Sequence, residues 1–104
     1  MAGRSVRLFL VDGIPHGMRT AEIGNWTGLA LVCPRTDLAR LAQRPEVKKT
    51  GIYILVGPSD AAASGMGVYV GEGDEVWSRL ASHDGGKDFW TQVVVFVVAP
   101  RAAP

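Results

Sequence analysis

The sequence predicts an α/β fold of the α+β type, in which a small antiparallel β-sheet is flanked by helices. Runs rich in β-branched and aromatic residues recur along the chain, at 6–11, 27–33, 52–56, 68–70 and 91–98. Turn residues such as Gly, Pro and Asp separate these runs, and segments with a helical spacing of apolar residues lie between some of them. A chain of 104 residues is long enough for one such domain with a modest hydrophobic core.

Composition and charge narrow the functional classes. The formal net charge of +1 disfavours strong non-specific binding of nucleic acid by the whole surface, but it allows a local cationic groove. Cys33 is the only cysteine, so no internal disulfide can form, and we expect a reducing, cytoplasmic setting. The apolar run at 8–11 is too short for a signal-peptide core or a membrane span, so we expect no membrane association.

In the first half of the chain, residues 6–11 have strand composition and end at the Asp12-Gly13 turn. Residues 18–26 include helix-favouring Ala and Glu and predict a short helix. A second strand is expected over 27–33, where Pro34 closes it.

A further helix should follow, which Thr36 or Asp37 can cap and which Pro45 should end or interrupt. One apolar face of this helix would hold Leu38, Leu41 and Ala42. Several cations surround it, and we interpret them as a solvated helix face: Arg35, Arg40, Arg44, Lys48 and Lys49.

In the second half, a period of two divides the strand 52–56 into two faces. The aliphatic face would hold Ile52, Ile54 and Val56, and the other face Tyr53 and Leu55. If this strand pairs with 68–70 as an antiparallel hairpin, a register that buries the two aliphatic faces together also places Tyr53 and Tyr69 on the same side.

Asp74 can cap the helix that comes next, and Asp84-Gly85-Gly86 should stop it. Val76, Leu80 and His83 form one stripe of this helix, and Arg79 lies four residues before His83. The nearly continuous apolar run at 91–98 is typical of a strand covered on both faces.

Several short motifs of the chain occur in an informative order. Gly51-Ile52-Tyr53 comes first, Tyr69-Val70-Gly71 follows on the next strand, and Arg79 and His83 lie on the helix after it. Other parts of the same pattern are Leu8-Phe9-Leu10-Val11-Asp12-Gly13, Asn25-Trp26-Thr27-Gly28 and Lys87-Asp88-Phe89-Trp90. Together these motifs resemble the GIY-YIG nuclease family, and the likeness extends over almost the whole chain.

The resemblance implies hydrolysis of DNA phosphodiester bonds with Mg²⁺ or Mn²⁺. It implies that Tyr53 is a general base or a water-positioning group, that Tyr69 assists it, and that Arg79 binds the scissile phosphate. His83 would donate to the phosphate or to a tyrosine oxygen. Gly71 and Lys87 would contact the substrate. Two tyrosines, an arginine and a metal carboxylate are chemically sufficient for this reaction.

The chain differs from the family pattern in one respect. In the family, the resemblance implies, a glutamate on a helix after the last of these strands ligates the metal. Residues 99–104 contain no acid, so we expect a C-terminally truncated GIY-YIG-like domain whose metal ligand is unknown. The acids beside the motif, Glu72 at a strand end and Asp74 at a helix cap, are expected to have structural roles rather than to bind the metal. We interpret 1–49 as an N-terminal extension, 50–98 as the GIY-YIG-like core and 99–104 as a flexible tail.

Two functions therefore stay open. One is a GIY-YIG-type DNA endonuclease, whose activity the missing carboxylate leaves uncertain. The other is a non-catalytic remnant that binds DNA or protein, as a homodimer or with a second chain that covers the sheet face which the absent helix leaves bare. A small-molecule enzyme has no supporting motif in the chain.

Taken one at a time, the singled-out residues have simpler interpretations. Two strand tyrosines are more often half-buried aromatics than catalytic groups, and a helix-end histidine more often serves the helix dipole. The safer interpretation of Cys33 is a buried structural thiol. The three tryptophans are expected to be core or interface anchors rather than base-stacking platforms: Trp26, Trp77 and Trp90.

Overall fold

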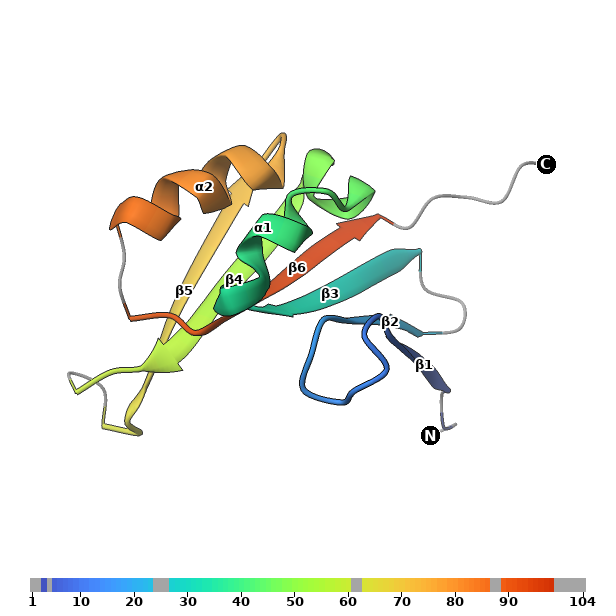
Figure 1. Ribbon diagram of the computed structural model, residues 1–104, viewed down its shortest axis with the longest axis horizontal. Helices are drawn as coiled ribbons and strands as arrows, with labels where there is room; N and C mark the ends of the chain where they lie inside the picture. Colours follow the sequence, from blue (N-terminus) through green and yellow to red (C-terminus); the bar gives the residue numbers. More distant parts are fainter. Residues whose placement is uncertain (1–2, 4, 24–26, 61–62, 87–88, 99–104) are drawn as a thin grey trace.

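The strands of the chain assemble into a single antiparallel sheet (Figure 1). The computed structural model describes residues 3, 5–23, 27–60, 63–86 and 89–98, without the side chains of 23 and 83–86. The six strands are β1 Val6–Leu10, β2 Arg19–Ile23, β3 Gly28–Pro34, β4 Gly51–Pro58, β5 Met66–Gly73 and β6 Gln92–Val98. Their order in the sheet is β1-β2-β3-β6-β4-β5, and every neighbouring pair is antiparallel. The predicted α+β class with an antiparallel sheet is confirmed.

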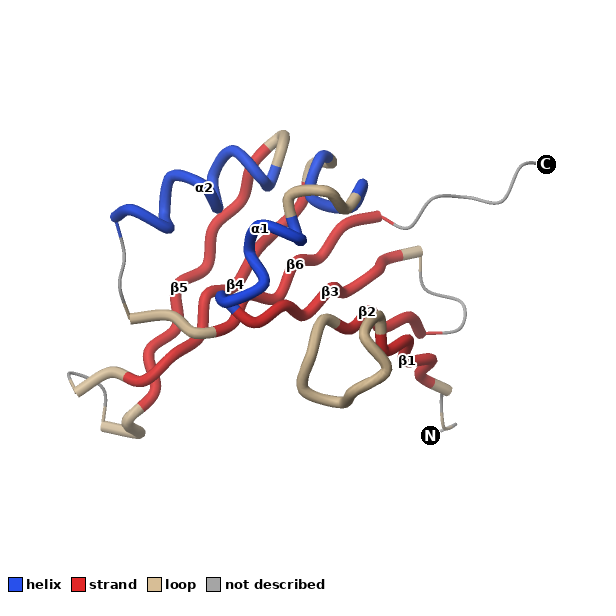
Figure 2. Tube along the Cα trace, in the orientation of Figure 1, coloured by secondary structure: helices blue, strands red, loops and turns tan. Residues whose placement is uncertain are grey.

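The helical segments lie over the part of the sheet that contains β3, β6, β4 and β5 (Figure 2). They are the 3₁₀-helices η1 Arg35–Asp37 and η2 Pro45–Lys48, and the α-helices α1 Leu38–Leu41 and α2 Val76–Gly86. Asp37 precedes α1 as predicted, but its side chain makes no capping hydrogen bond. Pro45 begins η2, where a missing backbone N–H costs nothing.

The hydrophobic core lies between the sheet and these helices. The sheet contributes alternate residues, which include Leu31, Leu55 and Val95, and the helical layer contributes Leu41, Val47, Val76 and Leu80, all buried. Because alternate strand residues face opposite sides, only one face of the sheet takes part in this core. The other face has no helix on it in the described part of the chain.

The predicted helix over 18–26 is wrong. Residues 19–23 form β2, which pairs with β1 on one side and with β3 on the other, and 24–26 lie outside the described residues. Thr20 is buried on the helix-bearing side of the sheet. Pairing on both edges satisfies the backbone groups of this segment, and that tertiary gain outweighs the weak helical preference of one Ala and one Glu.

The expectation that the hairpin buries its aliphatic faces is also wrong. Tyr53 and Leu55 face the helices, whereas Ile52 is 46% exposed and Val70 is 60% exposed on the opposite side. Period-two alternation separates the two faces of a strand, but it does not say which face the helices will cover. The associated prediction, that both tyrosines share a face, is confirmed by their contact.

Strand β6 was expected to be covered on both faces, and the structure corrects this too. Val93, Val95 and Val97 are buried beneath the helical layer, while Val94 and Phe96 are only partly buried. The central position of β6 shields its second face through neighbouring strands rather than through a second layer.

Helix α2 begins at Val76, two residues after the predicted cap Asp74.

The boundary proposed between 49 and 50 falls just before β4, and strands from both sides of it pair directly through β3 and β6. This boundary stays an interpretation of the sequence, and 99–104 lie outside the described residues.

Among the described residues, no helix combines the length and the apolar character that crossing a membrane requires.

Candidate functional site

The tyrosines of the two tripeptides lie side by side on the helix-bearing face of the sheet. Tyr53 on β4 pairs with Gly71 on β5, and Tyr69 pairs with Leu55, so the two tyrosines are diagonal neighbours. Their ring centroids are 6.3 Å apart with an interplanar angle of 35°. Tyr53 is buried to 2% exposure, whereas Tyr69 is partly exposed.

Gly71 makes room for the phenol of Tyr53. A Cβ on Gly71 would overlap the Cζ and hydroxyl oxygen of Tyr53, because the ring crosses the strand at that residue. The resemblance assigned Gly71 to substrate contact. That role stays a prediction, and the structure shows in addition that the missing side chain of Gly71 leaves the space which the Tyr53 ring occupies.

Arg79 projects from α2 toward the same end of β5. A Cβ built on Gly73 would be 3.0 Å from Cγ of Arg79, so this glycine leaves space for the arginine stem. Arg79 is exposed, and among the described residues no carboxylate lies within ion-pair distance of its guanidinium. Its charge reaches Tyr53, where it acts to lower the pKa.

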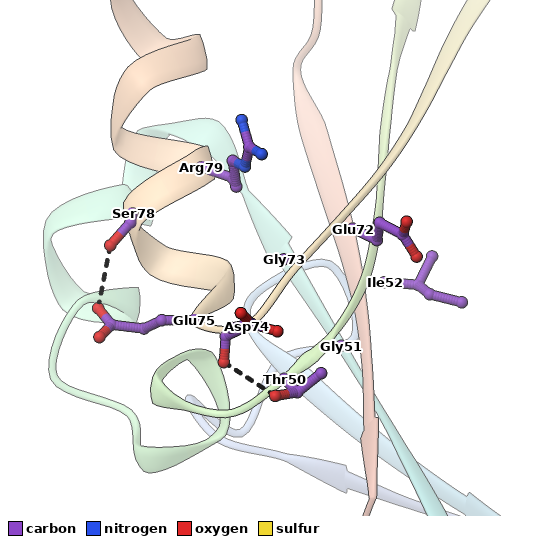
Figure 3. Close-up of a pocket in the computed structure, with 9 residues that line it drawn as sticks. All are labelled: Thr50, Gly51, Ile52, Glu72, Gly73, Asp74, Glu75, Ser78 and Arg79. Atoms are coloured by element: carbon purple, nitrogen blue, oxygen red, sulfur yellow. Dashed lines mark hydrogen bonds between the residues drawn. The ribbon is translucent and has the colours of Figure 1, made fainter.

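A cleft of about 610 Å³ opens beside Arg79 (Figure 3). Its walls are Thr50, Gly51, Ile52, Glu72, Gly73, Asp74, Glu75, Ser78 and Arg79. Gly51 and Gly73 are cross-strand partners, so the helix-facing side of the hairpin carries no side chain at its open end. Among the sequence-predicted site residues that the structure describes, Arg79 lines this cleft and the two tyrosines do not.

Backbone and hydroxyl contacts hold the cleft together. The Thr50 hydroxyl donates to the backbone oxygen of Asp74 at 3.0 Å, and the Ser78 hydroxyl donates to a Glu75 carboxylate oxygen at 3.3 Å (Figure 3). The backbone N–H of Val76 donates to the oxygen of Lys49 at 3.2 Å, which ties the start of α2 to the segment before β4. These contacts fix the helix that carries Arg79 against the hairpin that carries the tyrosines.

The pKa of the Tyr53 phenol is raised above its ordinary value. Burial is the main cause, and the neighbouring Tyr69 raises it further through its charge when ionised and through a hydrogen bond with Tyr53. Arg79 acts in the opposite direction without reversing the shift. Tyr53 is therefore a neutral phenol at pH 7, suited to donate a hydrogen bond and not poised to accept a proton as a phenolate.

The acids near this site do not assemble into a metal site. Glu72 lies beside Ile52 on the far face of the hairpin, away from Arg79, and the Glu75 carboxylate is engaged by Ser78 (Figure 3). Among the described residues, no group of three or more His, Cys, Asp or Glu side chains could hold a metal ion. The described donor set therefore does not fit the Mg²⁺ or Mn²⁺ that the resemblance implies.

The other predicted site residues lie at the end of α2. His83 is four residues after Arg79 on this helix, but its side chain is outside the described part of the structure. Lys87 lies wholly outside the described residues. The site that the structure does describe consists of Tyr53, Tyr69 and Arg79.

Sequence reasoning missed Thr50 and Ser78 as cleft residues. The available signal was Gly51 of the first tripeptide together with Gly73, which follows the second tripeptide, since a glycine that faces a glycine across a hairpin leaves an empty place that neighbouring polar residues then line.

Several cations of the predicted solvated helix face have definite side-chain partners. The Arg35 guanidinium lies 4.4 Å from the Trp90 ring centroid, Arg40 is ion-paired with Asp12, and Arg44 with Glu46. The Lys48 ammonium likewise lies 6.0 Å from the Trp77 ring centroid. These cations have structural partners, which makes them less available to nucleic acid.

Comparison of the chain with protein-family models, with curated proteins and with solved structures found no match in any of the three.

Proposed function

We propose that this chain carries a GIY-YIG-type site that binds the phosphodiester backbone of DNA and hydrolyses it. The observation that carries the proposal is that Tyr53 and Tyr69 are in contact on the helix-bearing face of the β4–β5 hairpin, and that the charge of Arg79 on α2 reaches Tyr53. A guanidinium without a carboxylate partner among the described residues is a good ligand for a phosphate oxygen. An adjacent pair of phenols can hold a water molecule by hydrogen bonds.

In this proposal the residues have separate tasks. Arg79 binds a non-bridging phosphate oxygen at the mouth of the cleft and stabilises the charge that develops there. Tyr53 and Tyr69 position the attacking water. Because the pKa of Tyr53 is raised, its neutral hydroxyl acts as a hydrogen-bond donor and leaves proton abstraction to another group.

A second candidate is DNA binding without hydrolysis. Two observations favour it: the described residues contain no cluster of metal ligands, and the neutral phenol of Tyr53 is a poor base. The same Arg79 would then bind backbone phosphate, while the strand would stay intact. The two candidates differ in turnover and not in the residues that touch DNA.

Supercoiled plasmid nicking and fluorescence anisotropy with a labelled duplex test both candidates on the same preparation. Each assay is run with Mg²⁺, with Mn²⁺ and with EDTA. The informative variants are Tyr53→Phe, which keeps the buried ring and removes the hydroxyl, and Arg79→Ala. The matched control is Arg7→Ala, which removes an exposed arginine from β1, the strand at the opposite edge of the sheet from β5.

If the site is a nuclease, the parent and Arg7→Ala nick the plasmid, and Tyr53→Phe and Arg79→Ala lose on the order of a hundredfold or more in rate. If the chain only binds, no variant nicks, and Arg79→Ala alone weakens the anisotropy signal. Equal binding by Arg79→Ala, Arg7→Ala and the parent, together with no nicking, rejects both candidates.

A further inference from the structure

The face of the sheet opposite the helices is apolar across all six strands, a surface we call the open face. Strand registers arrange its side chains in two cross-strand rows. The first row is Leu10, Arg19, Val32, Val94, Ile54 and Val70. The second row is Leu8, Ala21, Ala30, Phe96, Ile52 and Glu72. Each row holds one charged residue.

Such a face is unusual for a sheet that meets water. Antiparallel sheets with one solvated face normally alternate apolar and polar residues, whereas here both faces are apolar. Leu8 is 62% exposed, Val70 is 60% exposed and Ile52 is 46% exposed on this side. A contiguous apolar surface of this kind marks an interaction site.

We propose that the open face is the interface of a homodimer, in which two copies of this chain pack sheet against sheet around a twofold axis parallel to the strands. This proposal stands apart from the proposed function, because the tyrosine site lies on the other face. The axis places β1 of one copy over β5 of its partner, β2 over β4, and β3 over β6. Face-to-face sheets of this type pack about 10 Å apart.

Side-chain sizes in the second row fit this arrangement. Reversal of the strand order places Phe96 of one copy over Ala30 of the other, and Ile52 over Ala21. Large side chains therefore meet small ones at both positions, twice over by symmetry. With the axis perpendicular to the strands, each strand would stack on its own copy, and Phe96 would meet Val94 instead. The row pattern thus selects the first arrangement.

The two charges fit it as well. Arg19 on β2 and Glu72 on β5 stand near opposite edges of the open face, at levels two residues apart along the strands. In the proposed dimer Glu72 of one copy lies above the β1–β2 edge of the other, one strand away from Arg19. The Arg19 guanidinium donates one hydrogen bond from Nη1 to the backbone oxygen of Gly17 at 2.8 Å and keeps further N–H donors, with which it pairs with Glu72 across this gap at each end of the proposed dimer.

The size of the face also favours a second sheet over a single helix. Six strands at about 4.8 Å spacing and five residues of about 3.4 Å give a face of roughly 500 Å², so two faces bring together on the order of 1,000 Å². That is the smallest area expected of a specific interface. A helix is only about 10 Å wide and would leave more than half of the face bare.

Sedimentation equilibrium over a range of protein concentration tests the proposal. The parent is expected to form a dimer. Val70→Lys should raise the dissociation constant by roughly tenfold or more, since it buries an unpaired charge. The control is Phe9→Lys, which makes the same kind of change at a 61% exposed residue on the helix-bearing side of β1, and it should leave the dimer unchanged.

Charge reversal provides a second test that depends on the register. Arg19→Glu and Glu72→Arg should each weaken the dimer several-fold, and the double variant should recover most of the loss. A parent that stays monomeric at all concentrations overturns the proposal, and so does a dimer that Phe9→Lys disrupts and Val70→Lys does not. A dimer without charge-reversal recovery overturns the proposed axis.

Discussion

The phenol of Tyr53 occupies the space that a side chain at Gly71 would need, so the two residues of the paired tripeptides are sterically dependent on each other. The second tripeptide therefore provides the phenol of Tyr69 and, at Gly71, the space for the ring of Tyr53. The close approach also explains how Tyr53 can be buried on a strand next to the edge strand β5. Its ring lies against β5 at Gly71 and belongs to the buried core.

Gly71→Ala should destabilise the fold by about 1–3 kcal/mol, because the added methyl group forces the Tyr53 ring out of its position. Urea unfolding followed by circular dichroism measures the loss. The control is a double-mutant cycle with Tyr53→Leu, whose shorter side chain does not cross β5. In that background Gly71→Ala should cost much less, and an equal cost in both backgrounds would contradict the steric explanation.

Tyr53 should ionise at higher pH than an ordinary phenol. Absorbance at 295 nm during a pH titration follows phenolate formation, and the difference between the parent and Tyr53→Phe isolates this residue. Because the folded-state pKa is raised above the ordinary value of 10.0, the folded protein holds the proton longer than the unfolded chain does. Stability should therefore fall as pH rises from about 10 through the folded-state pKa.

The Tyr53→Phe variant should lose that part of the alkaline decline in the free energy of unfolding. A phenol that titrates at or below pH 10 in the folded protein would show that Arg79 outweighs burial, and would revive the general-base role.

Arg79→Ala should weaken DNA binding and reduce the slope of log K against log[salt] by about one. The physical reason is that one phosphate contact releases about one condensed counterion. Anisotropy titrations at several NaCl concentrations give this slope. Arg79→Lys should keep most of the salt dependence, since it keeps the charge, but lose affinity through its single-point contact. An unchanged slope in Arg79→Ala would remove Arg79 from the DNA interface.

Cys33 should react slowly with thiol reagents in the folded protein. It is fully buried, and burial, with a smaller contribution from the charge of Asp37, raises its pKa to about 11. Since the thiolate is the reactive form, labelling by Ellman's reagent at pH 8 should be about a hundredfold or more slower than in urea. Rapid labelling without denaturant would show that β3 opens easily from the sheet.

Much of this fold was predictable where local pattern and tertiary environment agree. The strand runs around Tyr53, Tyr69 and Val95 have strong β propensity and became strands, and the shared side of the two tyrosines follows from period-two alternation once they pair. Arg79 likewise falls on the expected helix. These features depend on neighbours close in sequence or on a hairpin, which short-range chemistry can specify.

The failures have a common cause in long-range contacts. Residues 19–23 became a strand because β1 and β3 bracket them, and no local signal announces that pairing. Strand β6 inserts between β3 and β4, far from either in sequence, and the helices cover the face of β4 that carries Tyr53 rather than the face that carries Ile52. The raised pKa of Tyr53 could not be predicted from the sequence either. Burial raises this pKa by more than the charge of Arg79 lowers it, and the spacing of residues along the chain does not show how deeply a side chain is buried.

The place of β6 has a consequence for how this protein is made. Strands β1 to β3 and the β4–β5 hairpin can each pair from adjacent sequence as they leave the ribosome, but among the described strands only β6 pairs with both parts, so the sheet is not continuous until Gln92–Val98 has emerged. Until then β3 and β4 each present a strand edge with unpaired backbone N–H and C=O groups. The slowest folding step of this protein should therefore be the docking of β6 between β3 and β4.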